Sequence, residues 1–358
     1  MSYSFKIVSQ LTQQSPLIAQ WQSLQADCID ANFYHDWRWH FALKTHLLPT
    51  MQWVVGYHDD SLISVVPIEH NEQTGIVSLP SHSQIDLFDV TLNQNHLNIQ
   101  WLHALFGFFS AEFQHWKRFS VRPVLKTSAM YQLYEQYSGL THNDPYLKNT
   151  FFNVSDAKAL AKLSKKHLKN INRLSRKLTN DVSEPTFEHA CPLPNSLDVF
   201  LAIEDSSWKG QPGENTSIRK SAALSAFYKQ VANAFNETGD CFICLCNTNN
   251  EYIAGQFALR TQNRLSMVKI GYNAKFHQYA PGNLLLAETL AFIAHSPINE
   301  VNLVTGPSWA DRWHPLTQTV HWLTFYNNTF GSKCDYWWAH IKDKLRPIAN
   351  KVRNKAVK

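Results

Sequence analysis

The segment from Arg264 to His295 has the residue order of a strand, a short loop and a helix. The strand is predicted to end at Tyr272, and the helix to open at Asn283 after the turn signal Pro281-Gly282. The first turn of a helix carries unpaired backbone N–H groups and the positive end of the helix dipole. Such a terminus can hold a phosphate or pyrophosphate without a charged side chain. The segment therefore predicts a phosphate-binding loop, and simple helix initiation by Pro-Gly is the alternative.

One carboxylate lies in a predicted helix where the spacing favours an apolar side chain. The helix covers residues 196–208, and one of its faces carries Leu197, Phe200, Leu201, Glu204 and Trp208. A carboxylate held there could accept the proton that an amine or hydroxyl loses as it attacks an acyl donor. Glu204 is therefore the first candidate base, and Asp311 is the second. The alternative is a structural ion pair of Glu204 with Lys209 or Arg312.

Residues that could bind a metal form no convincing site. Cys241, Cys244 and Cys246 are close in sequence, but on a strand Cys241 points to the opposite face from the other two. No second ligand cluster follows at the spacing of a zinc site. The sequence also lacks the P-loop, G-x-S-x-G, H-E-x-x-H and G-x-G-x-x-G motifs, which disfavours the enzyme classes that they define. We expect no metal centre.

The elements that must position these residues occur in a repeated order. In the first half the predicted elements are two helices and a hairpin, at residues 17–26, 33–47 and 51–70. In the second half they are again two helices and a hairpin, at residues 196–208, 222–238 and 241–260. The hairpins turn at Asp59-Asp60 and at residues 248–250, and a third strand at 264–272 follows the second hairpin. The chain of 358 residues is long for one domain. Its repeated order predicts an α/β fold of two tandem units with mixed sheets.

A first basic segment lies at residues 157–180, in a chain whose net charge is +5. It contains no acid and eight bases, namely Lys158, Lys162, Lys165, Lys166, Lys169, Arg173, Arg176 and Lys177. A helix predicted at 157–179 would carry them opposite a leucine-rich stripe. A solvated outer face is one interpretation. The other is contact with a phosphate-bearing partner, such as the 3′-phosphate of CoA, a tRNA or an anionic glycolipid.

A second basic segment is the C-terminal region at residues 337–358. Trp337 and Trp338 stand at its start, and its cations lie opposite the apolar residues Ile341, Leu345, Ile348 and Val352. This composition is typical of a helix that rests on an anionic membrane surface. A helix packed on the protein body, with a basic end, is the alternative.

From Lys165 to Trp313 the chain resembles the GNAT superfamily acetyltransferases of bacterial cellulose and exopolysaccharide gene clusters, which are related to the Fem-type peptidoglycan aminoacyltransferases. The segments that carry the resemblance are LSKKHLKNINRLSRKL, EDSSWKG (Glu204–Gly210), FYKQVANAF, YIAGQFALR, KIGYN (Lys269–Asn273), YAPGNLLL (Tyr279–Leu286) and Gly306. Their order and spacing, more than any single segment, make the match specific. The first half resembles the degenerate first GNAT unit of such proteins.

The resemblance implies an acyltransferase that uses acyl-CoA, in the simplest case acetyl-CoA, as co-substrate and needs no metal. The strand would pair with the pantetheine and the loop would receive the pyrophosphate, which assigns the donor site to Lys269, Ile270, Gly271, Tyr272, Gln278, Tyr279, Ala280, Gly282 and Asn283. A glycan or amine acceptor would meet Trp208, Lys209, Trp309 and Arg312. The acceptor would belong to a cell-envelope or exopolysaccharide precursor.

Two departures from the family pattern keep other functions open. The loop reads Gln278-Tyr-Ala-Pro-Gly282 with one glycine, where relatives have Q/R-x-x-G-x-G/A, and GPSWADRW stands where relatives show a Tyr-Lys pair. One alternative is a Fem-type transferase that takes its aminoacyl group from a charged tRNA, which the basic helix favours. The other is a non-catalytic scaffold that binds an acidic partner or a membrane.

These interpretations predict three regions. Residues 1–150 would form the degenerate N-terminal GNAT-like domain, residues 151–325 the GNAT acyltransferase domain, and residues 326–358 the basic C-terminal helix or tail. The chain shows no signal peptide and no apolar span of membrane length, and its six cysteines are scattered. We therefore expect a cytoplasmic protein, with peripheral contact at the inner membrane face as a further expectation.

Overall fold

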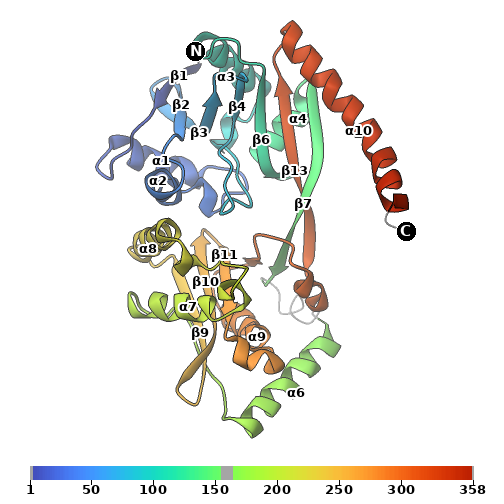
Figure 1. The fold of residues 1–358 in the computed structure, drawn as a ribbon. Coiled ribbons are helices and arrows are strands. Elements are labelled where there is room, and N and C mark those ends of the chain that lie inside the picture. The colour runs from blue at the N-terminus through green and yellow to red at the C-terminus, as the bar shows by residue number, and fades with distance from the viewer. Residues whose placement is uncertain (1–2, 155–163, 357–358) are drawn as a thin grey trace. The chain divides into compact units, whose positions relative to one another are not determined.

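The computed structural model describes residues 3–154 and 164–356 and shows the expected α/β composition (Figure 1). Two compact units divide the chain. Unit 1 comprises residues 1–30, 50–146 and 319–358, and unit 2 comprises residues 31–49 and 147–318. The domain boundaries predicted at residues 150 and 325 stay predictions. They assume continuous domains, whereas each compact unit consists of separate segments of the sequence.

The strands of unit 1 follow the order β1-β2-β3-β4-β6-β13, with parallel and antiparallel pairs and with β5 beside β3. Its strands are β1 (Tyr3–Val8), β2 (Gln52–His58), β3 (Ser61–Asn71), β4 (Ile76–Ser78), β5 (Thr91–Leu92), β6 (Arg118–Leu125) and β13 (Leu316–Tyr326). Only β4 and β6 pair in parallel among these described strands. The β2–β3 hairpin turns at Asp59 and Asp60, whose φ angles are 46° and 66°. Two successive left-handed residues define a type I′ turn, so the predicted hairpin is confirmed.

The helices of unit 1 are α1 (Pro16–Ala26), α3 (Ile99–Glu112), α4 (Ala129–Gln136) and α10 (Phe330–Ala356), with the short 3-10 helix η2 (Gln94–His96). Polar side chains define two of the starts. Asn98 accepts the Trp101 N–H at 3.0 Å at the start of α3, and Ser128 accepts the Tyr131 N–H at 3.4 Å at the start of α4. Buried tryptophans, Trp21 and Trp53 among them, fill the core between these helices and the sheet.

The strands of unit 2 follow the order β7-β12-β11-β10-β9-β8, with parallel and antiparallel pairs. Its strands are β7 (Thr141–Asn153), β8 (Thr186–Glu188), β9 (Cys241–Thr248), β10 (Glu251–Thr261), β11 (Arg264–Tyr272) and β12 (Glu300–Asn302). The β9–β10 hairpin turns at Asn249 and Asn250, with φ angles of 48° and 60°, as the sequence predicts. Strands β7 and β13 contribute residues to both units.

The helices of unit 2 are α2 (Trp37–His46), α6 (Lys165–Asp181), α7 (Asn195–Asp205), α8 (Ala222–Asn236) and α9 (Pro281–Ile293). Helices α7 and α9 cover opposite faces of the sheet, because neighbouring residues of a strand point to opposite sides. Gly255 of β10 faces Phe200 of α7, whereas Gln256 bonds to Thr289 of α9. The part of the predicted basic helix at residues 157–163 lies outside the described residues, and its remainder forms α6.

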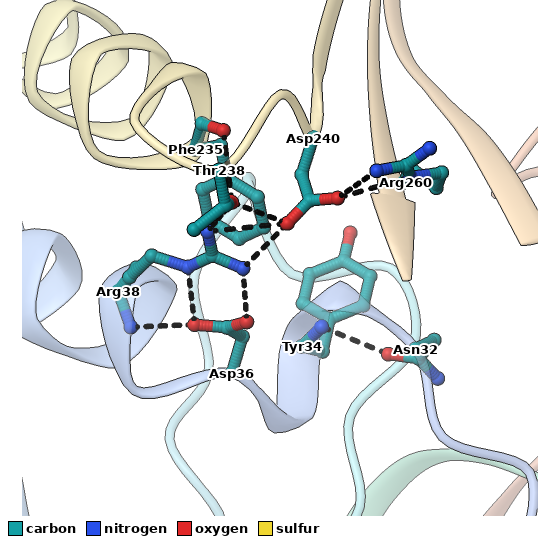
Figure 2. Close-up of polar contacts among 8 residues, drawn as sticks. All are labelled: Asn32, Tyr34, Asp36, Arg38, Phe235, Thr238, Asp240 and Arg260. Carbon is teal, nitrogen blue, oxygen red and sulfur yellow. Dashed lines mark hydrogen bonds and ion pairs between the residues drawn. The ribbon is translucent and has the colours of Figure 1, made fainter. Parts of the chain in front are cut away.

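The segment at residues 31–49 belongs to unit 2 although it lies in the first half of the sequence. Figure 2 shows how Arg38 of α2 holds it there, by pairing with Asp36 at 2.7 Å and with Asp240 at 3.4 Å. Asp240 also pairs with Arg260 of β10 at 2.9 Å, and the Arg38 guanidinium lies 3.8 Å from the centre of the Phe235 ring. Burial lowers the pKa of Arg38, but the carboxylates of Asp36 and Asp240 outweigh burial and raise it. This network fixes α2 against α8 and β10.

Candidate active-site cleft

Strand β11 has one paired edge and one edge that becomes free along its length. It pairs with β10 in antiparallel register as far as Tyr272, but with β12 only from Arg264 to Ser266. Beyond Ser266 no strand of the described residues covers this second edge. Backbone N–H and C=O groups on such an edge can pair with an extended ligand.

A cleft of about 520 Å³ opens at this free edge, within unit 2. Most of the residues predicted for the donor and acceptor sites line it, namely Ile270, Gly271, Tyr272, Ala280, Gly282, Asn283, Trp208, Lys209 and Trp309. Residues from the strand, from the loop and from the region after Asp205 therefore meet at one site, although the sequence separates them by up to a hundred positions. This size and largely apolar lining are typical of a small-molecule site.

The first turn of α9 forms one wall of the cleft. Pro281 has no backbone N–H, and the N–H groups of Asn283 and Leu284 are both accepted by the Ala280 carbonyl, at 2.9 and 3.2 Å. The Gly282 N–H makes no hydrogen bond to any described residue, and a Cβ placed on Gly282 would meet nothing within 4 Å. The helix start thus presents one free donor and its positive dipole end to open space.

Two contacts fix the position of that turn. Ala280 is left-handed, with φ 51° and ψ 52°, a conformation that costs an alanine about 1 kcal/mol. The Trp313 indole N–H donates to the Asn283 side-chain oxygen at 3.1 Å, and Trp313 is fully buried. The loop that carries Trp309 is therefore attached to the start of α9.

Glu204 lies directly beneath the cleft, on α7. A Cβ on Gly271 would stand 2.8 Å from the Glu204 Cα, so only a glycine at this position lets α7 approach β11 so closely. Glu204 is 1% exposed and does not line the cleft. One carboxylate oxygen pairs with the Lys209 ammonium at 3.2 Å, and the other accepts the Ile218 N–H at 2.9 Å. The ion pair with Lys209, which the sequence left open as the alternative to a base, is present.

Lys209 connects this buried carboxylate to the cleft. Its ammonium donates to the Ile270 carbonyl at 3.1 Å, on the strand whose edge is free, and Lys209 itself lines the cleft. Lys209 follows α7 in a 3-10 turn (η3, Trp208–Gly210), because α7 ends at Asp205 and not at Trp208 as predicted. The Ser207 hydroxyl accepts the Lys209 N–H at 3.3 Å and starts this turn.

The remaining predicted residues lie away from the cleft lining. The Lys269 ammonium stands 5.8 Å from the centre of the Tyr228 ring, and the Tyr279 hydroxyl donates to Asp181 of α6 at 3.1 Å. The side chains of three others, Gln278, Asp311 and Arg312, are exposed. No ion pair joins Arg312 to Glu204 among the described residues.

Several lining residues were not predicted, and Gln256 is the most informative of them. It is 3% exposed, lines the cleft and accepts the Thr289 hydroxyl at 2.9 Å. The signal for it is an amide in the otherwise apolar strand YIAGQFALR. Met267, Leu286 and Leu303 are apolar members of the lining, and nothing in the local sequence distinguishes them from ordinary core residues.

Two findings concern metals and membranes. Residues 3–154 and 164–356 contain no group of three or more His, Cys, Asp or Glu side chains placed to hold a metal ion. Cys241, Cys244 and Cys246 are all buried. None of the described helices is both long and apolar enough to cross a membrane.

Comparisons with known proteins agree on the second unit and on the overall fold. Residues 165–313 match the family model described as acetyltransferase (GNAT) domain. The crystal structure of FemX is similar over 92% of this chain and 98% of its own, with a TM-score of 0.63 and 9% identity. The C-terminal domain of a putative lysylphosphatidylglycerol synthetase from Agrobacterium fabrum is similar over 92% and 96%, with a TM-score of 0.58 and 9% identity. No curated protein matches the chain in sequence. Likeness at such low identity concerns the fold alone.

Proposed function

We propose that this acyltransferase moves an acyl group, in the simplest case acetyl, from acyl-CoA to an amine or hydroxyl of a cell-envelope or exopolysaccharide precursor. The match of residues 165–313 to the GNAT acetyltransferase family model supports the proposal. One observation carries the proposal. The free edge of β11 and the first turn of α9 line the same cleft.

The donor would use both of these features. Its pantetheine amides would pair with the backbone of β11 beyond Ser266, where β12 no longer does. Its pyrophosphate would lie at the Gly282 N–H, with the helix dipole stabilising the negative charge. A backbone N–H of the same strand edge would polarise the thioester carbonyl and stabilise the oxyanion that forms on attack.

The acceptor would enter beside Trp208, Lys209 and Trp309, with exposed Arg312 at the periphery. Glu204 is the proposed proton acceptor and Asp311 the second candidate. Since Glu204 pairs with Lys209 at 3.2 Å and does not line the cleft, an acceptor proton would reach it through Lys209 or after Lys209 moves. The same ion pair fixes the position of the Lys209 charge. The ammonium is held by the Glu204 carboxylate on one side and by the Ile270 carbonyl on the other.

A second candidate is a Fem-type transferase that uses an aminoacyl-tRNA, and α6 is the observation that favours it. Its cations are all exposed and form no ion pair with a described carboxylate, namely Lys165, Lys166, Lys169, Arg173, Arg176 and Lys177. Binding of a tRNA through its phosphates would weaken steeply as salt rises. Binding of CoA through one pyrophosphate would change much less, so a salt titration separates the two donors.

Acyl transfer with a variant at the cleft wall tests the first proposal. Gly282→Leu would place a side chain in the space meant for the pyrophosphate, and we expect at least a tenfold rise in the KM for acetyl-CoA. The matched control is Gly107→Leu, because a Cβ on Gly107 of α3 also meets nothing within 4 Å. Equal transfer by both variants would contradict the assigned donor site.

A further inference from the structure

Helix α10 packs on unit 1 by one face and leaves an apolar stripe exposed. Ser332 is fully buried, and the rings of Tyr336 and His340 meet those of Tyr326 and His142 at 5.5 and 5.1 Å. The opposite face carries large apolar side chains with high exposed fractions, namely Phe330 (85%), Trp337 (64%), Trp338 (59%), Ile341 (46%) and Leu345 (53%). At 100° per residue these positions share an arc of about 100°. An amphipathic helix normally turns such a stripe to the core, so its exposure marks an interaction surface.

Cations border this apolar stripe. Lys333 and Lys342 are both exposed, and helical spacing places them on either side of it. The Lys342 ammonium lies 5.5 Å from the centre of the Trp338 ring. Over residues 330–358 the sequence holds eight Lys or Arg against two Asp. Apolar and aromatic residues flanked by lysines are the pattern of a helix that lies in the interface of an anionic membrane, where the lysines reach the headgroups.

A pocket of about 430 Å³ opens beside α10 in unit 1. Arg118 and Arg122 of β6, Lys342 of α10 and the hydroxyls of Ser78, Ser81 and Thr324 line it. Arg122 lies 3.9 Å from the centre of the Trp322 ring and forms no ion pair with a carboxylate in the described part of unit 1.

Two carboxylates lie near this pocket. Asp144 lines it and shares a hydrogen bond of 3.1 Å with the His142 ring, and Asp335 meets Arg118 at 3.5 Å. The guanidinium of Arg122 and the ammonium of Lys342 thus remain to bind an anion, and the hydroxyls can donate to its oxygens. A phosphate group fits this set of donors.

We propose that unit 1 docks on an anionic phospholipid membrane. The exposed stripe of α10 enters the interface, and the pocket beside it binds one phosphate headgroup through Arg122 and Lys342. The two features share Lys342, so a lipid held in the pocket lies next to the inserted tryptophans. The proposal is independent of the acyl-transfer reaction, because neither feature belongs to the cleft of unit 2.

Cosedimentation of the full chain with vesicles tests this docking, without CoA or an acceptor. Neutral phosphatidylcholine vesicles are compared with vesicles in which about a third of the lipid is phosphatidylglycerol, and we expect at least tenfold tighter binding to the second kind. The double variant Trp337→Ser/Ile341→Ser should lose binding. Arg122→Gln should lower the preference for anionic vesicles about fivefold, the effect of one cation near the surface.

Two control variants match these changes. Leu316→Ser removes another exposed apolar side chain, and Lys220→Gln removes another exposed cation; both should bind like the original chain. Equal binding to both kinds of vesicle, no binding, or equal losses in the controls would overturn the proposal. The proposal would also be overturned if the chain did not bind vesicles but formed a dimer that requires Trp337 and Ile341. Arg122-dependent binding of inorganic phosphate without vesicle binding would assign the pocket to a soluble anion instead.

Discussion

At the scale of single residues, Gly271 determines which charged groups can lie at the cleft. It brings the α7 backbone against β11, so that Glu204 lies under the free strand edge and its partner Lys209 reaches the Ile270 carbonyl. The Glu204 carboxylate is buried, whereas Lys209 lines the cleft. The charge that faces a substrate is therefore that of Lys209, while Glu204 holds it in place.

Gly271→Ala should disturb both stability and transfer. The added methyl would stand 2.8 Å from the Glu204 Cα, and a backbone atom cannot yield as a side-chain end can. We expect a loss of about 1–3 kcal/mol in the free energy of unfolding, as for other overpacked sites, together with reduced kcat. Denaturant titration and transfer kinetics measure the two effects. Gly107→Ala is the control, and a Gly271→Ala variant as stable and active as the original would refute the close approach.

Glu204→Gln tests the proposed proton acceptor while it keeps an oxygen for the Ile218 N–H. Loss of a general base costs roughly a hundredfold or more in rate, and we expect kcat to fall with little change in the KM for acetyl-CoA. If the proton passes through Lys209, the kcat of Lys209→Met should fall as far as that of Glu204→Gln. The base assignment is wrong if Glu204→Gln and Asp311→Asn both retain full transfer.

At the scale of elements, the sequence predicted what local patterns encode. Both hairpins follow from pairs of Asp or Asn at left-handed turn positions, and α9 follows from Pro281-Gly282. Strands β7 and β13 were not predicted, because their polar and aromatic residues show no clean alternation and their pairing partners are far away in the sequence. The exchange of residues 31–49 into unit 2 has the same origin, since the Arg38–Asp240 contact spans 202 positions.

The candidate site likewise contains residues that local sequence patterns predict and residues that only packing brings together. Strand β11 and the loop at Ala280–Asn283 could be found from their order, because strand, turn and helix signals are local. The pairing of Glu204 with Lys209 could only be named as one of two outcomes, since it depends on where α7 ends. Gln256, Met267 and Leu303 reach the cleft through packing of three separate strands or loops, which no local pattern records.

Arg38→Met should destabilise unit 2 by about 3 kcal/mol, because it leaves the carboxylates of Asp36 and Asp240 without their shared partner in a largely buried place. Chemical unfolding of the full chain measures this, with Arg176→Met on the exposed face of α6 as the control. A similar small loss in both variants would show that the network does not hold the segment.

At the scale of the whole molecule, unit 1 should make stability depend on pH through Asp89. Burial raises the pKa of this carboxyl from 3.8 to about 7, although it accepts the Met130 N–H at 3.4 Å. The folded state therefore favours the protonated form. The stability that this preference provides is complete below about pH 4 and is lost as pH rises through about 7.

Asp89→Asn should be more stable than the original chain at pH 8, on the order of a few kcal/mol, because an amide needs no proton to stay neutral. The advantage should shrink as the pH falls toward 4. Thermal unfolding across this pH range measures it. A constant difference between the two chains would show that Asp89 does not titrate with folding.

The central claim is that the cleft of unit 2 binds an acyl-CoA, and titration of the full chain with acetyl-CoA tests it most directly. We predict saturable binding and a rise in thermal stability, about 2.7 kcal/mol when the ligand reaches a hundred times its Kd, which Gly282→Leu largely removes and Gly107→Leu does not. If neither acetyl-CoA nor a longer acyl-CoA binds or shifts the unfolding temperature, the donor site that we assign is contradicted.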